Sequence, residues 1–269
     1  MKGKLIFLTL LILYSCSEND SDNTFINFKF NHKWNETTVN SDDFYSIQFQ
    51  NNFGNMLSIE RLRYLISDIQ ITNSAGESYS LNEYNLLDLE ENSSLSFESS
   101  QTVKIGLYSN ISFVFGFRDE YNIDGAYTDL NTANWSVPMM LGGGYHYMQL
   151  DGKYISNNGN ESGYNYHAIR AVDSPGPNPT FPQETFFKVD LGPVNIQKEC
   201  EITISMNIAN WFEIPNTWDL NELNQMLMAN SDAQILMYQN GQNVFNIESV
   251  ELFTIIFINL PINFLIMLI

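Results

Sequence analysis

Apolar and polar side chains alternate with a period of two along most of this chain. In TFINFKFNH, Ile26, Phe28 and Phe30 share one face with His32, and polar residues take the other. This alternation, rich in Phe, Tyr and Ile, is typical of half-buried antiparallel strands. Further runs of this kind are RLRYLISDIQIT, TVKIGL, ISFVFGF, ETFFKVDL and CEITISMNI, with turn signals such as NSAGE and NNGN between runs. The pattern predicts a mostly β fold, an antiparallel β-sandwich.

One segment has the period of a helix instead. In NTWDLNELNQMLM, Leu220, Leu223 and Leu227 stand at helical spacing, with Asn216 or Thr217 as the expected N-cap. We therefore expect one short helix near the C-terminal part of the sandwich. The sandwich itself is expected to span residues 24–251, which is long enough to bury a substantial core.

The N-terminal residues indicate export. Lys2 and Lys4 precede a short apolar run, and the tetrapeptide LYSC ends at Cys16. This layout predicts a lipoprotein signal peptide over residues 1–15, with Cys16 as the acylated first residue of the mature protein. Residues 16–23 are polar and acidic, as in a flexible tether. The prediction is therefore an outer-membrane lipoprotein, facing the periplasm or exposed at the surface.

Residues 252–269 form a second apolar segment. The run is long enough to be considered as a membrane span, but Asn259, Pro261 and Asn263 lie in its centre and no basic residue flanks it. A last β-strand that continues into an apolar tail is the preferred interpretation, and a true span is the alternative.

Charge and cysteine content exclude several classes of protein. A net charge of −19 excludes nucleic acid as a partner, because phosphate binding needs clustered Lys and Arg. With Cys16 acylated, the only remaining cysteine is Cys200, so a disulfide framework and a cysteine-cluster metal site are excluded. Cys200 alternates with apolar residues and is expected to be a buried thiol.

The chemistry-bearing candidates are the three histidines. In GGGYHYMQLDG, strand alternation places His146 and Met148 on one face, and a glycine-containing turn connects this segment to the strand that contains His167. A two-residue turn at Asn158-Gly159 would set Leu150 opposite His167. Another register would set His146 directly opposite His167, with Cβ atoms about 5 Å apart. A β-bulge would break this parity.

Two imidazoles with a thioether suit copper, particularly Cu(I). The alternative is that the histidines only bond to backbone carbonyls or buried hydroxyls. Calcium is a weaker candidate: YNIDGAYTDLN places Asp124 and Asp129 in a polar loop, without the dense alternation of a calcium-binding loop. The sequence contains neither HExxH nor GxSxG, and no phosphate-cradling glycine loop.

Five segments occur in an order that resembles the MbnP-like family of copper-binding proteins. They are FINFKFNHKWN, RLRYLISDIQITNSAGESYSL, GGGYHYMQLDGKY, WFEIPNTWDL and YQNGQNVFNIESV. The resemblance covers about residues 25–250. It implies a mostly antiparallel β fold without enzymatic activity, copper held by histidines, and, for members of this kind, a lipoprotein.

This chain departs from the family pattern in one segment. Met139, Met140 and Leu141 stand where the family has aromatic residues. The best-studied members oxidise one tryptophan to kynurenine, which helps to bind copper, with a di-haem peroxidase as partner. Here Trp34 and Trp135 are the candidates for such a modified aromatic residue, by proximity to the motifs.

Three hypotheses follow for the function. The first is a lipid-anchored cell-envelope protein that binds copper through His146 and His167, with Met148 and His32 contributing, for copper uptake, storage or handover. A di-haem peroxidase or an outer-membrane receptor would be its partner. The second is a non-metal surface module that binds a glycan or protein ligand through exposed aromatics, such as Tyr145 and Tyr164. The third is a structural adhesion component.

Overall fold

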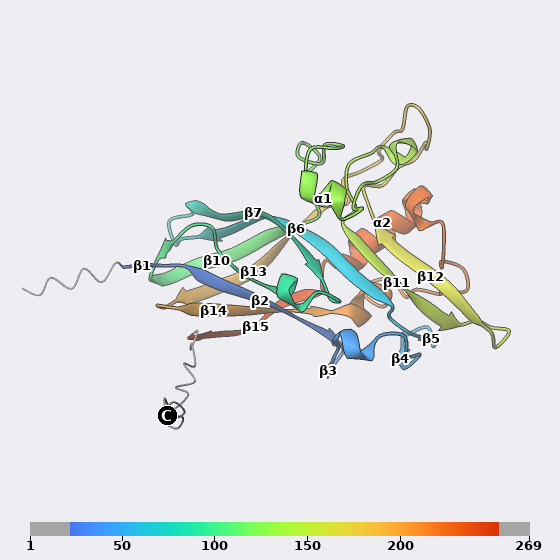
Figure 1. Ribbon diagram of the computed structural model, residues 1–269, viewed down its shortest axis with the longest axis horizontal. Coiled ribbons are helices and arrows are strands. Elements are labelled where there is room, and N and C mark those ends of the chain that lie inside the picture. The colour runs from blue at the N-terminus through green and yellow to red at the C-terminus, as the bar shows by residue number, and fades with distance from the viewer. Residues whose placement is uncertain (1–21, 253–269) are drawn as a thin grey trace, which may run out of the picture.

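The computed structural model describes residues 22–252, and in this part most residues in regular structure form strands (Figure 1). The larger sheet follows the order β13-β10-β6-β11-β5-β4, with β7 paired to β6 and β12 to β11. Its strands are β4 (Phe49–Gln50), β5 (Met56–Leu57), β6 (Arg61–Thr72), β7 (Ser78–Asp88), β10 (Gly106–Phe115), β11 (Met148–Ile155), β12 (Glu161–Ala168) and β13 (Phe187–Ile196).

The smaller sheet follows the order β15-β14-β2-β3, with β8 paired to β2. Its strands are β2 (Ile26–Trp34), β3 (Thr37–Thr38), β8 (Ser96–Glu98), β14 (Cys200–Asn207) and β15 (Phe245–Leu252). A short ladder joins β1 (Asn23–Thr24) to β9 (Val103–Lys104). The pairing is antiparallel except between β14 and β2, which run parallel. The predicted antiparallel β-sandwich is therefore confirmed as the fold class.

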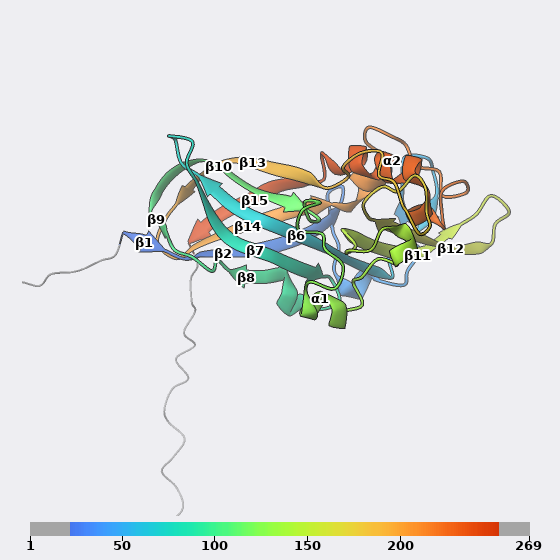
Figure 2. The same cartoon turned by 90° about the horizontal axis from the view of Figure 1, so that it is seen from above.

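The core lies between the two sheets, which lie one above the other in Figure 1 and overlap in the view from above in Figure 2. Alternation along β2 buries Ile26, Phe28 and Phe30, as predicted. Phe30 reaches across to the larger sheet, with its ring centroid 6.4 Å from that of Tyr64 and 6.2 Å from that of Phe113. Burying large aromatic rings in this way supplies most of the apolar area that holds such a sandwich together.

The helix lies later in the chain than the leucine spacing predicts. Residues 216–226 form turns, because the backbone N–H of Leu220 donates to Asn55 Oδ1 and the Trp218 indole donates to the Leu223 carbonyl. The helix is α2 (Ser231–Gly241), capped by the Asn230 side chain. Its buried side is made of Ala, Gln, Met and Gly, which gives little apolar periodicity for a sequence pattern to detect.

A second helix, α1 (Thr128–Thr132), lies in the segment that joins β10 to β11. Between residues 22 and 252, neither helix has the length and apolar character that crossing a bilayer requires. The predicted signal peptide, Cys16 and the tail after Leu252 lie outside the described residues.

Candidate metal centre

The β11–β12 hairpin sets the face of each side chain near the histidines. Gln149 pairs with His167, and Leu150 with Tyr166. This register differs from both expected ones, because residues 157–159 form a three-residue loop in which Gly159 takes a positive φ of 80°. Leu150 and Tyr166 are buried in the core, so Gln149 and His167 share the opposite, outer face of the sheet.

A bulge at Tyr147 turns His146 to the face of His167. The Tyr147 N–H donates to the Ala168 carbonyl at 2.8 Å, while Met148 also pairs with Ala168. Two residues of this strand thus oppose one on β12, and both belong to the main core. The parity of the strand therefore changes before Met148. The imidazole rings of His146 and His167 lie edge to face, with centroids 5.5 Å apart.

The glycines before His146 allow this approach. Gly142, Gly143 and Gly144 all have positive φ values, of 98°, 68° and 75°. A Cβ at Gly144 would lie 2.8 Å from the backbone oxygen of Asn122. A larger residue would therefore displace the segment that leads into the bulge.

His146 is oriented by the backbone of Trp135. The His146 N–H donates to the Trp135 carbonyl at 3.0 Å, and Nδ1 of the ring lies 2.9 Å from the same oxygen. Because a carbonyl oxygen can only accept, Nδ1 carries the hydrogen and Nε2 keeps its lone pair. This is the arrangement in which metal-binding histidines are normally held.

His167 is oriented by a carboxylate. Its Nε2 lies 2.7 Å from Asp151 Oδ1, and Asp151 also contacts Arg61 at 3.1 Å. Burial alone would raise the pKa of Asp151, but the bonds from His167 and Asn165 and the charge of Arg61 together lower it. The ionised carboxylate accepts from Nε2–H, so the lone pair of His167 resides on Nδ1.

Burial keeps His146 neutral. The side chain is 5 % exposed, and desolvation lowers its pKa to about 4. The bond to the Trp135 carbonyl opposes this shift, while the nearby His167 and Arg63 reinforce it. A neutral imidazole is the form that binds a metal, so His146 needs no deprotonation at neutral pH.

Trp135 and Arg63 complete the surroundings of the pair. Trp135 is fully buried, with its ring centroid 5.6 Å from that of His146 and the Arg63 guanidinium 5.0 Å from its ring. The indole Nε1 has no hydrogen-bond partner. An orphaned buried donor costs about 1–3 kcal/mol. Arg63 in turn donates to Gln149 Oε1 at 2.8 Å and to the Ala133 carbonyl at 3.1 Å.

Three sequence candidates lie away from this pair. Met148 points into the core on the face opposite His167, as a consequence of the bulge. His32 is buried between the sheets, where Nε2 lies 3.1 Å from the Tyr64 hydroxyl. Trp34 stacks on Phe49 and donates to the Gln50 carbonyl. Strand alternation places Met148 on the face of His146, but the structure puts it on the opposite face. His32, the further expected contributor, lies between the sheets instead.

In the loop that was expected to bind calcium, the carboxylates accept hydrogen bonds from other groups of the protein. Asp124 Oδ1 accepts from the Gly144 N–H at 3.3 Å, and Asp129 Oδ1 accepts from the Tyr84 hydroxyl at 2.7 Å. Within residues 22–252, no cluster of three or more His, Cys, Asp or Glu side chains is arranged to hold a metal ion. Among His, Cys, Asp and Glu side chains, a site at the histidine pair would therefore have the two imidazoles as its ligands.

Sequence reasoning missed Asp151, Gln149 and Arg63. Asp151 and Gln149 follow His146 at odd spacings, so simple alternation places them on the opposite face. Arg63 belongs to β6, and only the observed pairing of Gln149 with Arg63 brings it to the site. The sole available signal was the alternation of Gln149 and Asp151 with core residues along β11.

Together, fold and site define a two-layer β protein with an oriented histidine pair, of which His146 is buried and His167 is partly buried. Residues 23–230 match the family model MbnP. The chain belongs to the MbnP family. In its fold it is similar to the solved structure of MbnP from Methylosinus trichosporium, at 11 % identity and a TM-score of 0.51, over 74 % of this chain and 80 % of that one. None of the curated proteins compared with the chain matches it.

Proposed function

We propose that this protein binds copper as Cu(I) through His146 Nε2 and His167 Nδ1. The observation that supports this most directly is the ring contact at 5.5 Å between two imidazoles whose other nitrogens are each engaged by a fixed acceptor. Metal–nitrogen bonds are about 2.0–2.1 Å long, so the two donors need to lie only about 4 Å apart. The resemblance to copper-binding relatives points the same way.

The charges around the pair favour a monovalent ion. Arg63 lies over Trp135 beside His146, and Arg61 pairs with Asp151. One carboxylate therefore faces two guanidinium groups. Divalent cations favour sites with more negative charge, whereas Cu(I) accepts two neutral imidazoles. Zinc would normally need further protein ligands to complete a tetrahedral set.

Trp135 is the modified aromatic residue in this proposal. The family resemblance implies oxidation of a tryptophan, and of the two candidates Trp135 is the one beside His146. Its unpartnered Nε1 lies in a fully buried ring, so the side chain has an unsatisfied polar atom close to the proposed ion. Mass spectrometry of the peptide that contains Trp135 tests for oxidation.

We further propose that the protein acts at the cell envelope as a copper carrier rather than an enzyme. Acylation of Cys16 would hold it at the outer membrane, and uptake, storage or handover of copper would be its role. The family resemblance supports a di-haem peroxidase or an outer-membrane receptor as partner.

A Cu(I) competition titration with a chromophoric chelator tests the site. The variant carries His146→Gln and His167→Gln, and Met148→Leu is the matched control, because it removes a thioether from the same strand with little change in volume. We expect loss of Cu(I) binding in the double variant and unchanged affinity in the control. Undiminished binding by a folded double variant, judged by its circular dichroism, contradicts the assignment.

A second candidate function, binding of a glycan, has a different location from the one the sequence suggested. Tyr145 and Tyr164 are buried, so neither can stack on a ligand. Instead, a cleft of about 340 Å³ is lined by the aromatic residues Tyr84, Phe117, Tyr121 and Tyr127, together with Ser67, Asp68, Ser80, Asn82, Glu83 and Arg118. Glycan-array binding that survives chelation and is lost in Tyr121→Ala would support this function.

A further inference from the structure

The ends of six strands lie at one end of the sandwich, which we term the terminal end. Cys200 pairs with Ile26 and with Leu252, so β2 and β14 begin where β15 ends. In the larger sheet, Gly106 pairs with Ile196 at the same end. The first strand, β1, lies here as well (Figure 1). Both ends of the described chain therefore leave the molecule on one side.

Large apolar side chains are exposed at the terminal end. Leu107 is 78 % exposed and Leu252 is 59 % exposed, and Phe25, Ile105 and Val250 are between 39 % and 43 % exposed. All five lie in or next to β1, the start of β10, or the end of β15. Isolated exposed apolar residues are ordinary, but a group of them at one end of a soluble domain marks an interaction surface.

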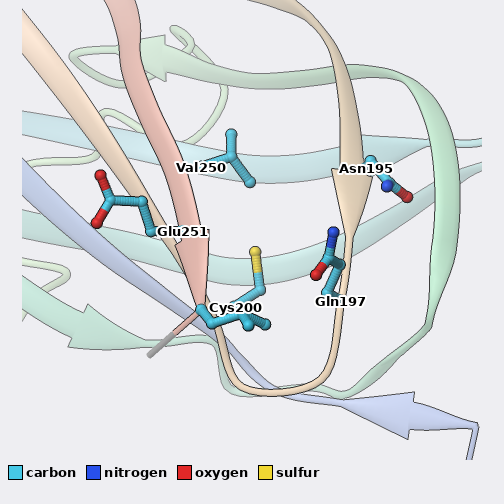
Figure 3. Close-up of a pocket in the computed structure, with 6 residues that line it drawn as sticks. Asn195, Gln197, Cys200, Val250 and Glu251 are labelled. Atoms are coloured by element: carbon cyan, nitrogen blue, oxygen red, sulfur yellow. The ribbon is translucent and has the colours of Figure 1, made fainter. Parts of the chain in front are cut away.

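A hollow of about 230 Å³ opens among these residues. Figure 3 shows Cys200 between Glu251 of β15 and Gln197, which follows β13, with Val250 and Asn195 above them. Asn195 pairs with Leu107, so the hollow lies beside the most exposed leucine of this end. The terminal end is thus uneven and partly apolar.

The charges of the terminal end do not suit attraction to an anionic surface. Lys104 and Lys198 lie here, but so do Glu199 and Glu251. Polybasic clusters are what draw proteins to anionic lipids. The partner of this end must therefore be recognised by apolar contact, and its binding should depend little on salt.

The short stretch of chain between Cys16 and β1 points to lipid as the partner of the terminal end. Asn23 lies seven positions after Cys16, and a fully extended chain spans at most about 3.6 Å per residue. An acyl group on Cys16 would thus keep β1 within about 25 Å of the membrane surface. The terminal end is the part of the sandwich that this short connection holds against lipid.

We propose that the terminal end rests on the lipid surface, with Phe25, Ile105, Leu107, Val250 and Leu252 entering the headgroup region. The inference depends on the lipid anchor of the proposed function. It also fixes the orientation of the domain. Arg63, beside the histidine pair, lies nine residues from Thr72 at the other end of β6, which corresponds to about 30 Å along the strand. The copper site therefore faces away from the membrane.

Depth-dependent fluorescence quenching tests the proposal on the full chain. The protein, produced with its own N-terminus, is reconstituted into phosphatidylcholine vesicles whose acyl chains are brominated. Leu107→Cys carries an environment-sensitive dye, and Met226→Cys, whose parent side chain is 81 % exposed, is the matched control. Met226 lies near the β12 side of the histidine pair, because Gln234 Nε2 donates to the backbone carbonyls of both His167 and Leu227, the residue after Met226. Cys200 is buried and stays unlabelled.

We expect bromine to quench the Leu107 label about twofold, with little salt dependence, and to leave the Met226 label unchanged. Equal quenching of both labels, or of neither in acylated protein, overturns the proposal. It is also overturned if the Leu107 label remains unquenched until residues 253–269 are deleted, because the tail then covers this end.

A second measurement separates this inference from the anchor. Mass spectrometry shows whether Cys16 is acylated, and an unmodified Cys16 contradicts the anchor itself. Flotation of a Cys16→Ser chain on phosphatidylcholine vesicles then tests the terminal end alone. Combining Phe25→Asn, Leu107→Asn and Leu252→Asn should lower the bound fraction at least about tenfold, because three exposed apolar side chains that enter the headgroup region are removed together. An unchanged bound fraction overturns the proposal.

Discussion

The protein contains two buried histidine environments that differ in what faces the ring. His32 lies between the sheets, with its Nε2 next to the Tyr64 hydroxyl. His146 faces a second imidazole and has one nitrogen fixed by the Trp135 carbonyl. Both rings are kept neutral by burial, which lowers the pKa of His32 to about 3 and that of His146 to about 4. Burial alone therefore does not distinguish a core histidine from a metal ligand. What distinguishes them is the group that faces the ring, which is a hydroxyl at His32 and a second imidazole at His146.

The largest expected effect comes from making the same substitution in each of the two histidine environments and comparing Cu(I) affinity with stability. His146→Gln should lower Cu(I) affinity by more than the factor of about 100 that loss of an outer-shell partner can cause. His32→Gln should leave the affinity unchanged and lower the free energy of unfolding. Chelator competition and urea denaturation, run on both variants, measure the two quantities. Parallel losses of affinity would show that His32 belongs to the site.

Acid should destabilise the protein through its core histidine. The folded pKa of His32, about 3, lies below the unfolded value of 6.5. Below pH 6.5 the unfolded chain therefore binds a proton that the folded chain rejects, and stability is lost as the pH falls towards 3. At pH 4.5 the loss from His32 is about 3 kcal/mol, at 1.36 kcal/mol per pH unit. Denaturation of wild type and His32→Gln between pH 7 and 4.5 measures it, and equal slopes would refute the assignment.

Asp151→Asn should have an intermediate effect on copper. The variant replaces the charged acceptor that orients His167, and loss of such a partner costs about 10–100-fold in metal affinity. Glu161→Gln on the same hairpin is the control, since its ion pair with Lys153 is exposed and should affect binding little. Equal losses of Cu(I) affinity in Asp151→Asn and Glu161→Gln, measured by the chelator titration, would contradict this role of Asp151.

The smallest expected effect concerns Met148. Because its thioether points into the core, Met148→Leu should change stability by less than about 1.5 kcal/mol, and Cu(I) affinity in the chelator titration should be unaltered. A loss of Cu(I) affinity would place the sulfur at the ion and contradict the observed strand parity.

Alternation predicted β2 well because this strand buries a single face. The run RLRYLISDIQIT coincides with β6, and the apolar face of β14 is buried as expected, although both strands also bury residues of the other face at their centres. The histidine pairing was predictable only as one of several registers. Its true register depends on a three-residue loop and on the bulge at Tyr147, and neither leaves a compositional signal. The helix was placed too early because a mixture of polar, small and methionine side chains, and no leucine, forms the buried side of α2.

The bulge has a consequence for how such a centre is gained or lost. The extra residue in the bulge at Tyr147 decides whether the His146 side chain lies on the core face of the sheet or on the face of His167. A regular ladder through the same residues would turn His146 to the core face while every imidazole stays in the chain. Among homologous proteins, a histidine pair on one face would then depend on the bulge, and a comparison that counts only conserved histidines would overlook it.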